Sequence, residues 1–251
     1  MKSEKMNFPC IYFTFHNDLQ MLLSRTQAGR VLKYVLKRRA SLKDIIESQG
    51  IPHTEVGQIF LQDTEVGFDF IPEGGEVIDV LPFTDAASVF ASTLLRPRPA
   101  RLSKFMADIN VKKLARNLRM LGLDTTLVPE MRLADIGYLA TSQQRILITR
   151  NRELLKCNSV VHGHLLRSEN HIIQLEEVVK RYQLKPYITP FTRCINCNGE
   201  LRPVTKQAVY YRLEPLTRKY FDSFKLCADC EKIYWQGSHH EQMRQLVERV
   251  L

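Results

Sequence analysis

Four of the six cysteines in this chain form two CxxC pairs that could share one metal ion. Thiolates at this spacing are typical ligands of a tetrahedral zinc ion, whereas disulfides are uncommon in a reducing compartment. Four thiolates leave no open coordination position, so the predicted zinc is structural. Gly199 follows the first pair and is free to take a left-handed conformation there. The expected ligands are Cys194, Cys197, Cys227 and Cys230.

Carboxylates form a second candidate site. Strands and helices alternate over residues 104–183, which predicts a parallel sheet whose carboxyl ends gather functional groups at one edge. Asp108, Asn151 and Glu169 follow the first, third and fourth strands, and Asp135 opens a helix that can face the same edge. Carboxylates that converge at one edge repel one another unless cations or protons intervene, and hard divalent metals are the usual solution. This predicts magnesium or manganese, which could activate a water molecule for attack on a phosphodiester. Each acid alone could instead cap a helix or lie on the surface.

Positive charge is concentrated in the C-terminal two thirds of the chain. The net charge is +9; residues 1–85 carry 9 lysines and arginines against 12 acids, and residues 86–251 carry 27 against 15. This distribution favours a polyanionic partner such as nucleic acid, although a basic solvated surface is the alternative.

One predicted helix presents a row of cations. Its apolar residues recur at helical spacing from Val111 to Leu121, and the cations lie on another face. Such a row beside an acidic cleft can hold phosphates, unless it is only a solvated outer face. The candidate RNA contacts are Lys112, Lys113, Arg116 and Arg119, together with Arg150 and Arg152 after the third strand.

The first 85 residues predict a β-grasp unit, a small mixed sheet with one helix. Ser41 and Asp44 form a capping-box variant at the start of the helix, and Gly74 and Gly75 supply a turn before the last strand. The expected strands are Ile11–His16, Val31–Leu36, Gln58–Leu61 and Glu76–Leu81.

A run of alternating arginine and proline, Arg96 to Arg101, marks the end of this unit and favours an extended, solvated backbone. The predicted organisation is therefore α/β, with a β-grasp domain, a linker, a parallel α/β domain, and a zinc ribbon with a C-terminal helix, at residues 1–85, 86–103, 104–190 and 191–251.

Aromatic residues are interleaved with lysine and arginine around the second half of the predicted ribbon. Exposed rings could stack on bases, although small ribbons also need aromatic residues as core. Ser238 and Glu241 predict a capping box for a last amphipathic helix that docks on the core of the chain. The aromatic residues are Tyr210, Tyr211, Tyr220, Phe221, Phe224, Tyr234 and Trp235.

Composition excludes several classes of protein. With 44% hydrophobic and 25% charged residues, the chain is neither a disordered polar chain nor a collagen-like repeat. No apolar run approaches the roughly 18 residues of a membrane span, and the opening MKSEKMNF lacks the features of a signal peptide. We therefore expect a folded cytoplasmic protein that does not associate with membranes.

Six separated motifs resemble the Mut-seven-C RNase family, in the order of that family. They are FMADINVKKLARNLRMLGLDT, ADIGYLA, RILITRNREL, LLRSENHIIQL, RCINCNGELRPV and CADCEKIYWQGSHHEQM. The resemblance implies a PIN-like fold with a C-terminal zinc ribbon and metal-dependent RNA cleavage. Residues 8–84, with SLKDIIESQGIPHTEVGQIFL and FIPEGGEVIDVLPF, resemble the ubiquitin-like domain found ahead of that RNase domain.

The resemblance also assigns roles at the acidic site. Asp108 matches the first acid, Asp135 falls in the second acidic segment with Glu130 as the weaker candidate, and Glu169 falls in the segment after the fourth strand. The chain departs from the family at Asn151, where the family has aspartate. A neutral amide should weaken divalent binding, unless Glu153 points into the cleft and compensates.

Three functions follow from these observations. The first is a metal-dependent ribonuclease of PIN-like type. The second is a weakened or inactive RNA- or ribosome-binding protein with the same fold. The third is an adaptor whose ubiquitin-like domain contacts a protein partner while the remainder binds RNA.

Overall fold

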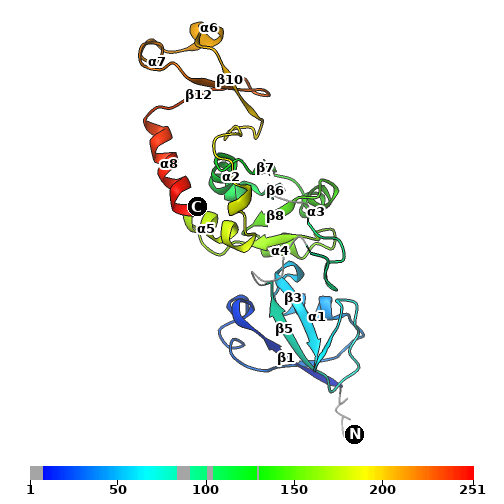
Figure 1. The fold of residues 1–251 in the computed structure, drawn as a ribbon. Helices are drawn as coiled ribbons and strands as arrows, with labels where there is room; N and C mark the ends of the chain where they lie inside the picture. Colours follow the sequence, from blue (N-terminus) through cyan, green and yellow to red (C-terminus); the bar gives the residue numbers. More distant parts are fainter. Residues whose placement is uncertain (1–7, 84–90, 101–103, 129) are drawn as a thin grey trace, which may run out of the picture. The chain divides into compact units, whose positions relative to one another are not determined.

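The computed structural model describes residues 8–83, 91–100, 104–128 and 130–251, which form two compact units (Figure 1). The first, here called the N-terminal unit, comprises Met1–Arg101 and Arg132–Leu165. The second, the C-terminal unit, comprises Leu102–Met131 and Leu166–Leu251. Part of the predicted α/β domain therefore belongs to the same unit as the β-grasp sheet.

The β-grasp sheet has five strands in the order β2-β1-β5-β3-β4. β1 and β5 are parallel, and the other neighbours are antiparallel. The four predicted strands are present, and the structure adds the short β4 and the 3-10 helix η1. The elements are β1 (Cys10–Phe15), η1 (Asn17–Leu22), β2 (Leu32–Val35), α1 (Leu42–Ser48), η2 (His53–Glu55), β3 (Val56–Leu61), β4 (Thr64–Glu65) and β5 (Val77–Pro82).

Alternation along β1 explains how this sheet forms its core. Ile11, Phe13 and Phe15 are buried, as are the residues on the apolar side of α1. The backbone N–H of Asp44 donates to Ser41 Oγ at 3.3 Å, which is the predicted N-cap of α1.

The N-terminal unit also contains α3 (Leu133–Ser142), β8 (Ile146–Thr149), α4 (Arg152–Leu155) and β9 (Gly163–Leu165), with β8 and β9 parallel. Buried polar contacts join this segment to the β-grasp. Glu55 Oε1 accepts a hydrogen bond from the backbone N–H of Leu165 at 2.7 Å and lies 3.2 Å from His164 Nδ1. His53, Glu55 and His164 are all buried, so the β-grasp is packed onto this segment and is not a loosely tethered module.

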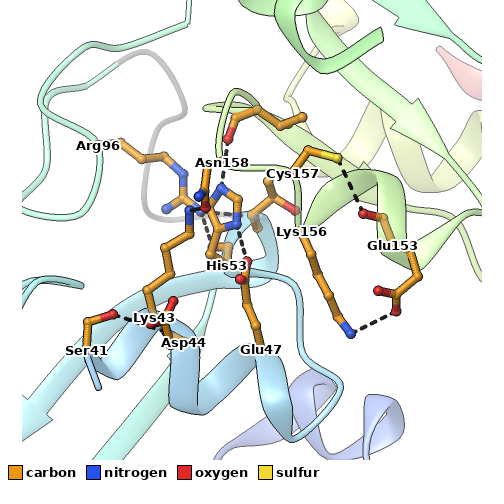
Figure 2. Close-up of polar contacts among 12 residues, drawn as sticks. Ser41, Lys43, Asp44, Glu47, His53, Arg96, Glu153, Lys156, Cys157 and Asn158 are labelled. Carbon is orange, nitrogen blue, oxygen red and sulfur yellow. Dashed lines mark hydrogen bonds and ion pairs between the residues drawn. The ribbon is translucent and has the colours of Figure 1, made fainter. Parts of the chain in front are cut away.

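Figure 2 shows further polar contacts at this junction. His53 lies between Glu47 Oε1, 2.6 Å from its Nδ1, and the carbonyl oxygen of Val160, 2.7 Å from its Nε2. Lys43 Nζ donates to Asn158 Oδ1 at 2.7 Å. The junction therefore combines charged side chains with backbone groups from both segments.

The arginine and proline run is placed differently from the expected solvated linker. Arg96 is buried, donates to the carbonyl oxygens of His53 and Thr54 at 3.2 and 2.9 Å, and lies over the ring of Phe83. The expectation was wrong for this residue because its guanidinium satisfies two carbonyls of the β-grasp. Residues 86–90 and 101–103 of the predicted linker lie outside the described residues.

The C-terminal unit begins with parallel strands β6 and β7, joined by α2. α5 follows, and then an antiparallel ribbon in the order β10-β11-β12 with two short helices at its tip (Figure 1). The bounds are β6 (Lys104–Ala107), η3 (Ile109–Val111), α2 (Lys112–Met120), β7 (Asp124–Leu127), α5 (His171–Arg181), η4 (Lys185–Tyr187), β10 (Leu201–Val204), α6 (Lys206–Val209), η5 (Tyr210–Arg212), α7 (Pro215–Tyr220), β11 (Phe224–Cys227), β12 (Ile233–Trp235) and α8 (Ser238–Val250).

The last helix, α8, begins at Ser238, the residue that the sequence predicts as its N-cap, so the helix starts one residue earlier than expected. Its N-cap is Gly237, with no side-chain cap, and Glu241 pairs with Arg244 instead. The predicted docking is confirmed, since Val247 and Val250 are buried and the helix contacts α5. Across the described residues, no helix has the length and apolarity to cross a membrane.

The buried Glu55 contact gives the first prediction. Glu55→Ala should lower the free energy of unfolding by about 3 kcal/mol, because the Leu165 amide and the His164 ring lose a buried acceptor. Urea unfolding of the full chain measures this change. Glu73→Ala, which removes an exposed glutamate of the same unit, should change stability by less than about 0.5 kcal/mol. Equal effects of the two variants would contradict a stabilising role for the Glu55 contact.

Candidate functional site

The four predicted cysteine ligands converge at the base of the ribbon. Their Sγ atoms all lie within 4.8 Å of one another. Cys194 and Cys230 are 3.6 Å apart at Sγ, and Cys197 and Cys227 are 3.3 Å apart. These four residues could hold a metal ion, and they are the one such group of three or more ligands found in the described part of the chain.

Backbone and tyrosine donors surround these sulfur atoms. The N–H groups of Cys197 and Cys230 point to the Sγ atoms of Cys194 and Cys227, each at 3.5 Å. Tyr234 Oη lies 3.0 Å from Cys194 Sγ. Burial acts to raise the pKa of Cys194, but hydrogen bonds from Tyr234 and from backbone N–H groups lower that pKa to about 6. The donor set therefore fits a closed structural site made of thiolates.

The turn that follows the first pair of cysteines differs in one detail from the expectation. Asn198 takes the left-handed conformation, with φ +78°, instead of Gly199. Gly199 is needed for close approach, because a Cβ there would lie 2.4 Å from Asp229 Oδ2 and 2.9 Å from Cys227 Sγ. Asn198 also accepts from the Thr125 N–H at 2.9 Å, which attaches the turn to β7.

Arg119 is buried, which differs from the expected phosphate contact. Its Nε donates to the Thr125 carbonyl at 2.7 Å, and its Nη1 donates to the Asn196 carbonyl at 2.7 Å. This guanidinium therefore braces α2 and β7 against the cysteine turn, and it is not exposed on the helix as the sequence predicts. A signal was present in the sequence, since Arg119 occupies the i+8 position of the apolar stripe that begins at Val111.

The other basic candidates are placed as follows. Lys112, Lys113 and Arg116 are exposed on α2, and Arg150 is exposed directly after β8. Arg152 is placed differently from the expectation, because its Nη1 donates to the Leu22 carbonyl of the β-grasp at 3.1 Å. The exposed cations of α2 are thus the clearest candidates for phosphate contacts.

Two of the acidic candidates lie in the C-terminal unit. Asp108 directly follows β6, is buried, and accepts a hydrogen bond from the N–H of Asn110 at 2.8 Å. Glu169 is exposed and lies just before α5, whose N-cap is Asn170. Glu130, the weaker sequence candidate, is also exposed.

Asp135 and Asn151 lie in the N-terminal unit. Asp135 is in the first turn of α3 and forms an ion pair with Arg132 at 2.8 Å. Asn151 is the N-cap of α4, because its Oδ1 accepts from the N–H groups of Glu153 and Leu154 at 3.0 and 3.4 Å. Glu153 pairs with Lys156 at 2.8 Å, and its side chain is 65% exposed.

The cysteine site gives a prediction on metal content. We expect one zinc ion per chain, and its removal should unfold the ribbon, because the core of the ribbon consists of few residues such as Val209, Leu213 and Phe224. Elemental analysis gives the metal content, and hydrogen exchange before and after chelation gives the protection of residues 193–235. Metal-free protein with an unchanged exchange pattern would rule out this role.

The Arg119 brace gives a separate prediction. Arg119→Met should destabilise the C-terminal unit by about 2 kcal/mol and speed zinc loss to a chelator, because buried carbonyl oxygens lose their donors. Arg116→Met removes an exposed arginine of the same helix and should change stability by less than about 0.5 kcal/mol. If the two variants unfold at the same denaturant concentration, Arg119 is not a structural brace.

Comparison with known families agrees with this architecture. Residues 103–247 match the Mut7-C RNAse domain, and residues 8–88 match the Mut7-C ubiquitin domain. No curated protein and no solved structure matches the chain. The β-grasp sheet agrees with the second assignment, and the four clustered cysteines are consistent with a zinc ribbon at the C-terminal end of the first. Because the first match spans more than half of the sequence, the chain belongs to the Mut7-C RNAse family.

Proposed function

We propose that this protein is a metal-dependent ribonuclease of PIN-like type, with structural zinc in the cysteine site. The observation that carries the proposal is the family match over residues 103–247. RNA is then the substrate, and the ubiquitin-like domain is a candidate surface for a protein partner in the cytoplasm.

Among the candidate acids, Asp108 has the environment that best suits a metal ligand. Its carboxylate is buried directly after a strand, where an ionised group requires hydrogen-bond donors or a cation. The candidate set of Asp108, Asp135, Asn151 and Glu169 offers only oxygen donors apart from the amide nitrogen, which suits magnesium or manganese. Such an ion would polarise the phosphodiester and lower the pKa of a bound water.

Asn151 is the residue that lowers the negative charge of this site. Asparagine and aspartate are both good N-caps, so Asn151→Asp should keep the hydrogen bonds to Glu153 and Leu154. The carboxylate would add a negative charge that the amide lacks. Native Asn151 therefore preserves the start of α4 while reducing the charge available to a divalent cation.

A weakened or inactive RNA-binding protein is the second candidate. Two ion pairs favour it, because Asp135 is paired with Arg132 and Glu153 is paired with Lys156. Asn151 also stands where the family resemblance implies an acid. The exposed cations of α2 would serve RNA binding equally well in either case.

Cleavage assays test the catalytic proposal. With labelled single-stranded RNA and magnesium or manganese, Asp108→Asn should lower the cleavage rate by about 100-fold or more, because a ligand to the ion is lost. Asn151→Asp should raise both cleavage rate and divalent affinity. Asp63→Asn, an exposed acid of the β-grasp, is the matched control and should leave the rate unchanged.

The outcomes separate the two candidates. Efficient cleavage by the wild type with no gain from Asn151→Asp would show that the ligand set is wrong. Absence of cleavage and of divalent binding in both proteins, with RNA binding retained, would leave the RNA-binding function.

Salt dependence tests the α2 contacts. Reversing Lys112 and Lys113 to glutamate should reduce the slope of log affinity against log salt by about 1.4 for single-stranded RNA, since each lost phosphate contact removes about 0.7. The loss should be similar for all RNA sequences. Reversal of Lys33 and Lys37, two exposed lysines of the β-grasp, makes the same change in net charge and should leave the slope intact. Equal slopes for both double variants would exclude a local contact.

A further inference from the structure

A groove of about 860 Å³ lies within the C-terminal unit, between α2, the start of α5, the ribbon and the start of α8. We call it the ribbon groove. Its volume falls in the range of sites that bind small ligands, and one or two nucleotides would fill it. The residues that give it chemical character are Arg116, His171, Lys232, Trp235, His239 and His240.

The charge of the ribbon groove favours an anionic ligand. No aspartate or glutamate is among its lining residues in the part of the chain that the structure describes. Arg116 and Lys232 are exposed cations on opposite elements, α2 and the ribbon. Three histidines add ring N–H groups, so the walls offer hydrogen-bond donors and positive charge.

Trp235 gives the ribbon groove an aromatic surface. It is the one tryptophan in the sequence, and it is 39% exposed at the end of β12. The neighbouring Tyr234 is occupied by its contact with Cys194, and His240 packs against Phe191 with ring centroids 4.4 Å apart. Trp235 is therefore the ring that is open to stack on a flat ligand.

The walls of the ribbon groove are held in place. Asn117 Nδ2 lies 2.9 Å from His171 Nδ1, and this contact holds the imidazole ring at the start of α5 against α2. Arg119 Nη1 donates to the carbonyl of the wall residue Ile195 at 3.3 Å. The Phe191 N–H donates to the Met120 carbonyl at 2.9 Å. Preformed walls reduce the conformational cost of binding.

We propose that the ribbon groove binds unpaired nucleotides of single-stranded RNA, with a base stacked on Trp235 and phosphates held by Arg116 and Lys232. This proposal rests on the proposed function for the identity of the ligand as RNA, and it adds the position and the single-strand preference. In duplex RNA the bases are paired and stacked on each other, so they cannot reach the face of Trp235.

Intrinsic fluorescence tests the proposal directly, because Trp235 is the one fluorescent indole. A single-stranded oligonucleotide of ten adenosines, added to the zinc-loaded full chain without magnesium or manganese, should quench the emission in a saturable way. A duplex of the same length and a ribose-phosphate chain without bases should not quench it. Saturable quenching by the duplex equal to that by the single strand would overturn the proposal, as would no quenching by the single strand.

Matched variants locate the contact. Binding of the variants is followed by the anisotropy of a dye-labelled oligonucleotide, because Trp235→Ala has no indole emission. Trp235→Ala and Arg116→Glu should each weaken single-strand binding about tenfold, the size expected for a lost stacking partner or a reversed phosphate contact. Tyr211→Ala removes a ring that is 90% exposed outside the groove, and Arg202→Glu reverses an exposed arginine outside it. Both controls should bind as the wild type does. Zinc content verifies that each variant has retained the ribbon.

The cleavage assay tests the ribonuclease function and the fluorescence assay tests the ribbon groove, so either proposal can fail without the other. Quenching without cleavage would retain the groove and remove the ribonuclease function, whereas cleavage without quenching would remove the groove and retain that function. If Tyr211→Ala weakens binding as much as Trp235→Ala, the RNA contact lies at the tip of the ribbon and the proposal is overturned.

Discussion

Four cysteine Sγ atoms within 4.8 Å of one another are the constraint on which the C-terminal unit depends. As thiolates, sulfur atoms at this separation would repel one another, so a cation held between them would make the arrangement favourable. The consequence extends beyond the ribbon. The turn after Cys194 presents the carbonyl oxygens of Ile195 and Asn196 to the guanidinium of Arg119, which also binds the Thr125 carbonyl. The cysteine site thus fixes α2 relative to the ribbon, and the ribbon groove lies between these two elements.

The N-terminal unit depends on a different constraint, which is that its buried polar groups are paired in hydrogen bonds. Glu55 and His53 form hydrogen bonds with groups of the segment that contains β8 and β9. Arg96 donates hydrogen bonds to the carbonyl oxygens of His53 and Thr54. Each of these groups would be costly to bury without its partner. The ubiquitin-like domain is therefore a structural part of this unit. A protein partner, where one binds, must use a surface that these contacts leave exposed.

Much of this architecture could be predicted because its signals are local. The CxxC spacing, the alternation along β1 and the Ser41 cap each depend on residues a few positions apart. Arg119, Arg152 and Arg96 could not be assigned in the same way. Arginine on an amphipathic helix or in a proline-rich run is normally solvated, and only the tertiary fold brings buried carbonyl oxygens within reach. The position of Arg119 on the apolar stripe was the one local indication. The acids were placed correctly beside strand ends and helix starts, but their ion pairs depend on neighbouring side chains.

If the proposed metal site is correct, position 151 has one role in folding and another in metal binding, and the two roles have different requirements. The cap of α4 needs an oxygen acceptor at this position, and asparagine supplies it as well as aspartate does. A divalent cation instead depends on the summed negative charge of its ligands, which asparagine lowers. An amide at this position therefore costs the fold little. The proposed nuclease site would weaken while the cysteine site, the basic face of α2 and the ribbon groove persist. Of the proposed functions, RNA binding would for this reason depend least on the residue at position 151.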